Sequence, residues 1–299
     1  MLIVGDAGDA HAAAVARRVT ALGLTAAYLD FAKFPAEARV VWDPIRRRGA
    51  VITAEMRVEL ERVRSVYWRS ASPTRAAKGL KKALHGFAEQ ETRKALESLL
   101  RGLGCPVVNP PEAIAGHRCK PVQSAAVAGL GVAVPDTVIT SDPEAAAEFF
   151  EAHPGGVIVK PVGGGAYARR LTRGDLARGD SIRASPMQFQ AWIPGEDLRV
   201  YVVGEEVLAG RIVLADADRV DFRTDPRHRS EAIALGGEEE ALCRRICRAL
   251  GMVWTGIDLR RTPAGQLVFL EANPSPMFLR FERDTGLEIL AGLVRLLTG

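Results

Sequence analysis

Apolar and polar positions follow two different periods along the first hundred residues, and these periods predict alternating strands and helices. Residues 2–5 read as a strand, 11–23 as a helix and 25–30 as a second strand, and the apolar run at 63–69 reads as a third strand. A helical pattern over 84–104 ends at a glycine, which is a common helix terminator. Strands that alternate with helices typically form one sheet covered by the helices, so we expect a small α/β domain here.

The middle of the chain carries the same two periods in a different order. Residues 120–131 and 141–152 read as helices, and the second begins at a Ser-Asp-Pro cap. Strand-like runs occupy residues 136–140, 155–161, 186–193, 198–204 and 206–214. A helix near 238–250 and a last helix over 286–297 flank a terminal hairpin. This order predicts a mixed fold of helices and strands, which is α/β or, more broadly, α+β.

The terminal hairpin holds polar residues on strands that otherwise read as buried. Its two apolar runs, GIDLRR and LVFLEAN, are joined by a four-residue loop, which places Arg261 opposite Gln266. In that register Asp258 faces Phe269, and Glu271 is its diagonal neighbour on the same side. Buried carboxylates are costly unless they are paired or bound to a cation, so this arrangement needs an explanation.

Side-chain alternation gives the hairpin an apolar face and an oxygen-bearing face. The expected apolar face consists of Ile257, Leu259, Val268 and Leu270. Asp258, Glu271 and Asn273 share the other face and bring three hard oxygen ligands together. That set suits Mg²⁺, which takes a few protein oxygens plus phosphate oxygens and water. The simpler reading is two surface carboxylates, and it would be preferred if the hairpin stood alone.

Two lysines elsewhere in the chain favour the metal site over two surface carboxylates. Lys160 ends a buried strand and is followed by glycines 163–165, and a lysine beside a loop with free backbone N–H groups is a plausible phosphate site. A glycine run by itself is weak evidence, because such runs are commonly linkers. Lys120 opens the helix before this strand. Combined with the hairpin, these features describe a nucleotide–magnesium site assembled from two subdomains.

These motifs resemble the ATP-grasp superfamily, and within it the branch of ribosomal-protein glutamate ligases and graspetide (ω-ester or ω-amide peptide) maturases. The resemblance rests on FQAWIPGEDLRVYVVG, on DFR at 221–223 and on GIDLRR with LVFLEANPSP. The N-terminal DFAKFP and VRSVYWRSASP, and the short loop GGGAYARRLT, favour the peptide maturases. The resemblance implies an N-terminal α/β pre-ATP-grasp domain over 1–105. It also implies a central subdomain over 106–186 and a C-terminal subdomain with the metal site over 187–299, which sandwich ATP.

The resemblance also implies roles for individual residues. Two lysines, Lys120 and Lys160, resemble those that hold the nucleotide phosphates, and Asp197 matches the acidic residue that binds ribose hydroxyls. The segment that reads adenine corresponds to Gln190, Ala191 and Ile193, and the metal ligands to Asp258, Glu271 and Asn273. Many relatives have an acidic residue where Ala191 stands. Because main-chain groups carry much of that contact, we expect altered adenine affinity and not its loss.

Three strand arginines, Arg199, Arg211 and Arg223, have two readings of equal weight. Arginine on a strand is most often solvated or paired at the surface. The alternative is an anion clamp, because the motifs around Arg199 and Arg223 resemble family arginines that face the transferring phosphate or the acidic substrate. We also expect Arg211 and Arg223 to hold an acidic side chain near the γ-phosphate. Arg69 is expected to tie the N-terminal domain down by an ion pair.

The implied activity is that of an ATP- and Mg²⁺-dependent ligase that activates a carboxylate as an acylphosphate. Phosphoryl transfer needs charge neutralisation and positioning, which accounts for the absence of a nucleophile–histidine constellation. The first reading is a macrocyclase acting on a ribosomal precursor peptide with leader and core. The second is a ligase that adds an amino acid to a protein or small acceptor, and the third is a non-catalytic nucleotide-binding scaffold. A homodimer is compatible with all three.

Composition and charge restrict the class of protein further. The chain has 299 residues, 47% hydrophobic and 25% charged, which suits one large or two to three small domains. A net charge of +4 from 40 basic and 36 acidic residues is too balanced to indicate a nucleic-acid partner. No apolar run approaches a membrane span and the N-terminus lacks a basic leader, so we expect a cytoplasmic protein.

Four cysteines show no disulfide framework for a chain of this length. Cys243 and Cys247 share one face of an expected helix, which would suit a metal pair. No histidine or cysteine lies near them in the sequence, so we expect small buried apolar side chains instead.

Overall fold

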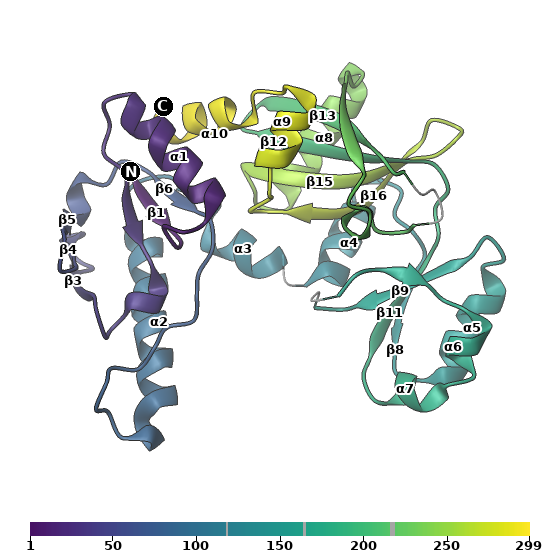
Figure 1. Ribbon diagram of the computed structural model, residues 1–299, viewed down its shortest axis with the longest axis horizontal. Coiled ribbons are helices and arrows are strands. Elements are labelled where there is room, and N and C mark those ends of the chain that lie inside the picture. Colours follow the sequence, from purple (N-terminus) through teal and green to yellow (C-terminus); the bar gives the residue numbers. More distant parts are fainter. Residues whose placement is uncertain (118, 164–165, 216–218) are drawn as a thin grey trace.

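Four sheets and their helices make up the chain, and a computed structural model describes residues 1–117, 119–163, 166–215 and 219–299 (Figure 1). The mixed α/β class predicted from the sequence is confirmed. The N-terminal part occupies the left of Figure 1, and the central and C-terminal parts lie one above the other on the right.

The N-terminal sheet is parallel and has helices on both faces. Its order is β2-β1-β6-β7, with bounds Ala27–Leu29, Leu2–Val4, Val66–Trp68 and Val107–Val108. Ile3 and Tyr67 pack in the same core cluster as α1 (Ala10–Ala21), whereas Leu2 and its neighbours pack with α2 (His85–Gly102). Successive side chains of a strand point to opposite faces of the sheet, which accounts for this division.

A three-stranded antiparallel sheet, absent from the sequence prediction, lies beside α2. Its strands are β3 (Arg39–Asp43), β4 (Arg48–Ile52) and β5 (Arg57–Glu59), paired in that order. Its strands are short, and the side chains of β3 and β5 are exposed or half-buried. Short strands without a clear alternation of apolar and polar residues give a weak pattern, which explains why the sequence did not reveal them.

The central sheet has the order β10-β9-β11-β8 and is antiparallel throughout. Its strands are β8 (Thr137–Thr140), β9 (Val157–Pro161), β10 (Arg169–Arg170) and β11 (Met187–Ala191). Helices α5 (Pro143–Ala152), α6 (Arg173–Leu176) and α7 (Gly179–Arg183) lie beside it. Asp142 caps α5 as predicted, because its side chain accepts a hydrogen bond from the backbone N–H of Glu144 at 3.0 Å.

The C-terminal sheet has five antiparallel strands in the order β14-β13-β12-β15-β16. Their bounds are Arg229–Ile233, Glu206–Val213, Glu196–Val203, Trp254–Arg261 and Leu267–Asn273. One face packs on α4 (Lys120–Ala128) and α8 (Gly237–Ala249), through a core that contains Val127, Ile246 and Phe269. On the other face, Asp197, Arg199 and Asp258 line a cavity that is also lined by Lys160 of the central sheet.

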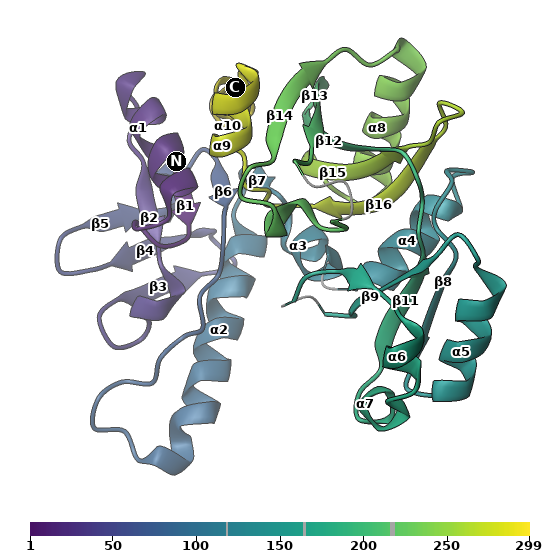
Figure 2. The ribbon, with the colours of Figure 1, turned by 45° about the vertical axis from the view of Figure 1, so that its right-hand side comes forward.

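The N-terminal and C-terminal parts share one apolar core. Residues of α1 pack in the same cluster as Trp254, Phe278 and α10 (Ile289–Thr298), and α1 and α10 lie side by side in Figures 1 and 2. The remaining helices are α3 (Pro111–His117), α9 (Leu279–Thr285) and the short 3-10 turns at Phe31–Lys33, Leu60–Arg62, Lys82–Leu84 and Phe222–Thr224. Among the helices that the structure describes, none combines the length and apolar character that crossing a bilayer requires.

Strand pairing differs slightly from the expected division after residues 105 and 186. β7 follows residue 105 but pairs with β6 of the N-terminal sheet. β11 follows residue 186 but pairs with β8 and β9 of the central sheet. The division into three parts therefore remains a proposal, with the first boundary moved past β7 and the second moved past β11.

Candidate active site

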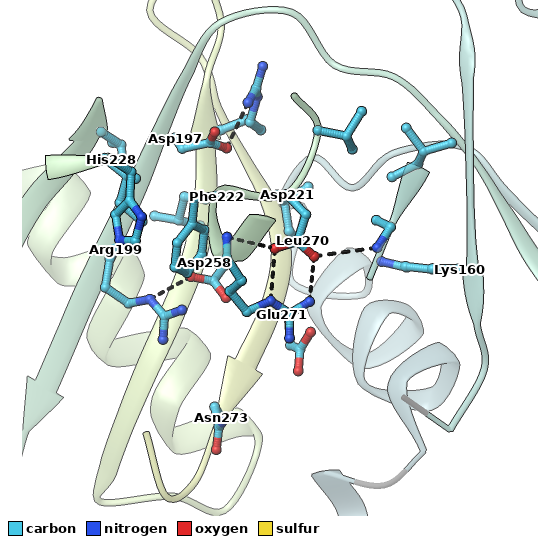
Figure 3. A pocket seen from close by; sticks show the side chains of 18 of the residues that line it. Lys160, Asp197, Arg199, Asp221, Phe222, His228, Asp258, Leu270, Glu271 and Asn273 are labelled. Carbon is cyan, nitrogen blue, oxygen red and sulfur yellow. Dashed lines mark hydrogen bonds and ion pairs between the residues drawn. The ribbon is translucent and has the colours of Figure 1, made fainter. Parts of the chain in front are cut away.

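A cavity of about 520 Å³ is lined by residues of both the central and the C-terminal sheet. Its lining comes from β9 and β11 on one side, from β12, β15 and β16 on the other, and from residues 220–223. Figure 3 shows Lys160 approaching from one side and Asp258, Glu271 and Asn273 from the other. The volume falls in the range of about 300–1,000 Å³ that is usual for small-molecule and cofactor sites.

The register of the terminal hairpin differs from the one predicted. Arg261 pairs with Leu267 and not with Gln266, which belongs to the loop. The pairing then shifts between Asp258 and Leu259, so that Asp258 lies directly opposite Glu271. The extra residue in this bulge is Leu270. A bulge of this kind places two residues of one strand opposite a single residue of the other.

Because of this bulge, the two faces of the hairpin differ from those expected from simple side-chain alternation. Leu270 lines the cavity, although it was expected on the apolar face. Phe269 is fully buried in the core with Ile257 and Leu259. A one-residue shift in register moves the side chains of a strand to the opposite faces of the sheet. The extra residue of the bulge restores the expected faces from Glu271 onward. Asp258, Glu271 and Asn273 therefore share the cavity face as predicted, by a different path.

Both carboxylates of the expected metal site are paired with cations. The Nε of Arg199 on β12 lies 2.6 Å from Oδ1 of Asp258, because the two residues are directly opposite each other across β12 and β15. Lys120, at the first turn of α4, donates to Glu271 at 2.9 Å. The sequence separations are 59 and 151 residues, so only the folded chain forms these pairs.

The electrostatic state of the two carboxylates differs. Burial raises the pKa of Asp258 to about 6 despite the opposing charge of Arg199. Burial also acts to raise the pKa of Glu271, but the charge and hydrogen bond of Lys120 outweigh it and the pKa is lowered. A site whose carboxylates are desolvated and only partly neutralised favours an additional cation.

The residues of this site fit a hard divalent cation. Two carboxylates and the amide of Asn273 supply oxygen ligands on one face, as Mg²⁺ prefers. Within the described residues no group of three or more histidine, cysteine or acidic side chains forms a metal cluster, so any cation here depends on the amide or on ligand oxygens. Cys243 and Cys247 are buried in the core with Phe269, as predicted.

Lys160 projects into the cavity from the end of β9. Its ammonium donates to the side-chain oxygen of Gln190 at 3.1 Å, and Gln190 in turn donates to Thr137 at 3.0 Å. Burial lowers the pKa of Lys160, with a further contribution from Lys120 against the pull of Glu271. A desolvated ammonium held by a neutral amide is available to an anionic ligand. The glycines 164 and 165 expected to assist it lie outside the described residues.

The expected nucleotide-reading segment lines the same cavity. Gln190, Ala191, Ile193 and Asp197 all contribute to its wall. Arg260 pairs with Asp197 at 2.7 Å and donates to the carbonyl oxygen of Ile193 at 3.0 Å. Arg260 does not stand out in the sequence, because an arginine next to Arg261 on a strand carries no distinguishing signal.

The three strand arginines separate in the structure. Arg199 and Arg223 line the cavity, and Arg223 is held by Asp221 through its Nε at 2.8 Å. Arg211 pairs in register with Leu198 and forms an ion pair with Glu231 at 2.6 Å. Residues directly opposite share a face, and Leu198 lies in the core with α8, so Arg211 is on the side of the sheet away from Arg199. The placement of Arg211 at the reacting phosphate is corrected accordingly.

The N-terminal part supports the segment that follows Asn273. Arg69 forms the expected ion pair, with Asp9 at 3.0 Å, and also donates to the carbonyl and hydroxyl oxygens of Ser275 at 2.9 Å. The backbone N–H of Ser275 donates to Asn273 at 3.0 Å. The first strands of the chain are thereby connected to the expected metal site.

Several cavity residues were missed by the sequence analysis. They include Asp221, Phe222, His228, Leu270 and Arg260. Asp221 and Phe222 lie inside the DFR motif, in which only Arg223 was given a role, so the motif itself was the available signal. His228 follows a turn and shows no periodicity.

Fold and site together define a ligase of the ATP-grasp type, and residues 118–297 match the RimK-like ATP-grasp domain. The match spans more than half of the chain, so the chain belongs to this family and the resemblance is confirmed. A probable alpha-L-glutamate ligase of Mannheimia succiniciproducens is 27% identical over 223 residues, which is 70% of this chain and 73% of that protein.

Solved structures extend the similarity to the whole chain. The ATP-grasp ligase PsnB, complexed with a phosphomimetic variant of its minimal precursor, Mg and ADP, is 30% identical. The TM-score is 0.82, and the superposition covers 99% of this chain and 96% of PsnB. The macrocyclase MdnC from Microcystis aeruginosa, bound with precursor peptide MdnA, has a TM-score of 0.86 at 22% identity, with 99% and 98% covered. At that identity the likeness to MdnC concerns the fold alone.

Proposed function

We propose that this ATP-grasp ligase acts on a ribosomally made precursor peptide. It activates acidic side chains of the peptide as acylphosphates and joins them to hydroxyl or amine side chains, which gives ester or amide cross-links. The observation that carries the ATP-dependent part is the single cavity in which Asp258 and Glu271 face Lys160, with Lys120 and Arg199 paired to the carboxylates.

The side chains divide into those that bind and those that neutralise charge. Lys120 and Lys160 would hold the phosphates, and Asp197 and the segment 190–193 would hold ribose and adenine. Arg199 and Arg223 would face the transferring phosphoryl group, where fixed positive charge stabilises the developing negative charge. Asp258, Glu271 and Asn273 would hold Mg²⁺, which supplies charge neutralisation between phosphate groups when bound.

Two steps follow from this arrangement. A substrate carboxylate oxygen attacks the γ-phosphorus of ATP, the bond to the β-phosphate oxygen breaks, and ADP leaves. The hydroxyl or amine of a second side chain then attacks the acyl carbon, loses its proton, and inorganic phosphate departs. Closure of each link removes one water from the peptide overall, and ATP hydrolysis supplies the driving force.

The peptide substrate is supported by the extent of the PsnB similarity. The family domain begins at residue 118, whereas the similarity to PsnB covers 99% of the chain and thus includes the N-terminal sheet. A peptide substrate needs a binding surface remote from the chemistry, because remote binding energy positions the reacting group. An additional N-terminal layer provides such a surface in principle.

The experiment incubates the enzyme with Mg·ATP and peptides from neighbouring short reading frames rich in Thr, Ser, Lys, Glu and Asp. Mass spectrometry should show loss of one water for each link. Replacing either the acidic or the nucleophilic side chain of the peptide should abolish that loss. Loss of water in peptides that lack either group would contradict the proposal.

The alternative is a ligase that adds an amino acid such as glutamate to a protein or small acceptor. It is favoured by the 27% identity to a probable alpha-L-glutamate ligase. The same mass measurement separates the two, because amino-acid addition increases the mass by whole residues. The ATP site is common to both functions and cannot distinguish them.

A further inference from the structure

Arg260 on β15 is buried, with 6% of its surface exposed, and its guanidinium contacts one short segment of the chain. Its Nη1 donates to Asp197 at 2.7 Å and its Nε donates to the carbonyl oxygen of Ile193 at 3.0 Å. The guanidinium carbon also lies 4.4 Å from the ring centroid of Trp192. Trp192 and Ile193 lie between β11 and β12, where the chain passes from one sheet to the next, and Asp197 lies at the start of β12.

The backbone brings these groups together before any side chain is considered. Asp197 and Arg260 are direct partners across β12 and β15, so their side chains emerge on the same face. Gly195 has a φ of +135°, and a Cβ there would come within 2.1 Å of the carbonyl oxygen of Arg261. The segment 192–195 therefore lies tightly against β15.

A second arginine braces the same segment from the central sheet. The guanidinium carbon of Arg170 on β10 lies 4.2 Å from the ring centroid of Trp192, and the backbone N–H of Trp192 donates to the carbonyl of Gly156 at 2.9 Å. The indole is thus engaged by a cation from each of the two sheets. Guanidinium stacking on an aromatic face is favourable and becomes stronger as the site is desolvated.

The chemistry of the pair decides what Asp197 can do. A guanidinium is planar and always charged, so it can fix one carboxylate oxygen in a defined direction. Arg260 holds Oδ1 of Asp197, and the carboxylate lines the cavity. A carboxylate anchored through one oxygen can accept hydrogen bonds from ligand hydroxyls through the other. Without the anchor, a desolvated carboxylate would rotate toward water or take up a proton.

We infer that Arg260 is a positioning residue that sets the preference of this site for a ribonucleotide over its deoxy analogues. It acts through Asp197 and the carbonyl of Ile193 and does not touch the phosphates. This inference rests on the proposed nucleotide site. It adds a residue to that site and a property, sugar discrimination, that none of the phosphate or metal ligands explains.

The chain offers a matched control in the neighbouring arginine. Arg261 follows on the same strand and pairs with Glu239 of α8 at 2.8 Å, on the side of the sheet away from the cavity. R260Q and R261Q each remove one charge and one ion pair from β15. R260K keeps the positive charge but loses the planar guanidinium and its several N–H donors, so it tests whether the geometry of the guanidinium matters. Thermal melting of each variant establishes the folded fraction.

Calorimetry then measures the dissociation constants of Mg·ATP, Mg·2′-deoxy-ATP and Mg·3′-deoxy-ATP. For the parent we expect weaker binding of at least one deoxy analogue. We define the deoxy penalty as the dissociation constant of a deoxy analogue divided by that of ATP. For R260Q we expect the dissociation constant of ATP to rise about 10- to 100-fold and the deoxy penalty to fall toward unity, because the Arg260–Asp197 pair is buried. R260K should fall between, and R261Q should stay within about threefold of the parent with the penalty unchanged.

The outcomes separate the inference from the function on which it rests. If the parent bound no nucleotide, the proposed function itself would fail. If R260Q folded and kept both its ATP affinity and its deoxy penalty, Arg260 would have no positioning role. An equal loss of affinity in R260Q and R261Q, with the deoxy penalty intact in both, would identify a general structural effect and overturn the inference. If R260Q did not fold, the deoxy penalty of R260K would decide.

Discussion

Asp258 and Glu271 lie directly opposite each other across β15 and β16, because a bulge at Leu270 shifts the pairing by one residue. Each carboxylate then meets a different cation, Arg199 at 2.6 Å and Lys120 at 2.9 Å. The bulge serves the site in two ways, since it also directs Leu270 into the cavity. Bulges are common next to active sites for this reason.

The first prediction concerns Glu271. E271Q keeps the shape of the side chain and an oxygen for Lys120, but removes the negative charge that a divalent cation requires. We expect turnover to fall by at least about a hundredfold, with thermal stability close to that of the parent. Steady-state rates over a Mg²⁺ titration and thermal melting are the measurements. E239Q, at the ion pair with Arg261, is the control, and equal activity in both variants would contradict the metal assignment.

The second prediction concerns Lys160, whose ammonium lies in the cavity beside Gln190. K160M should raise the dissociation constant of ATP about 10- to 100-fold, because hydrogen bonds to charged groups contribute about 1.5–3 kcal/mol. K160R should bind more tightly than K160M, since it retains the charge. Calorimetry with ATP measures both, and the exposed Lys94 provides the control K94M. Parent-like binding by K160M would show that Lys160 is a structural strand end.

The third prediction compares two arginines that differ in the face they occupy. R223Q should lower kcat/KM by at least about tenfold, because its guanidinium faces the cavity where negative charge develops. R211Q should stay within about threefold of the parent, since Arg211 pairs with Glu231 on the other side of the sheet. Initial rates of ADP release with peptide substrate provide the comparison. A larger loss in R211Q than in R223Q would reverse the assignment.

The fourth prediction concerns Asn109, which is fully buried where the N-terminal and C-terminal parts meet. Its amide donates to the carbonyls of Trp254 and Pro274 at 2.5 and 2.6 Å and accepts from the N–H groups of Val253 and Trp254 at 2.8 and 3.1 Å.

N109A should lower the free energy of unfolding by at least about 2 kcal/mol, because each buried group left without a partner costs about 1–3 kcal/mol. Thermal melting should show a fall of roughly 4–8 °C. Q266A removes an amide from the exposed hairpin loop and should leave the melting temperature unchanged. A parent-like N109A would show that water or side-chain movement replaces the lost bonds.

The fifth prediction concerns thiol reactivity. Burial raises the pKa of both Cys243 and Cys247 to about 12, so at pH 8 only about one in ten thousand of these thiols would be ionised. Cys119 is exposed beside Lys120. A disulfide-exchange reagent at pH 8 should therefore modify Cys119 rapidly and leave the buried pair intact until denaturant is added. Rapid labelling of Cys243 or Cys247 in the folded protein, located by peptide mass mapping that separates them from the half-buried Cys105, would contradict this ranking.

Most of the residues that we propose for the metal and phosphate sites were recognisable in the sequence. Asp258, Glu271, Asn273 and Lys160 stand out because polar side chains on buried strands are rare unless they bind something. The alternation of strands and helices likewise indicated the α/β class, since the longer elements show their patterns locally. The β3–β5 sheet was missed because its strands are short and do not alternate clearly between apolar and polar residues.

The strand register and the pairing of side chains follow from contacts between distant parts of the chain. A one-residue shift at the hairpin loop and a compensating bulge at Leu270 accompany the packing of Phe269 in one core with α8 and with α4, which lies far away in the sequence. The face of Arg211 follows from its pairing with Leu198. The role of Arg260 arises only when β12 lies beside β15 and Asp197 meets its guanidinium. Long-range packing fixes such contacts, and no local pattern of residues records them.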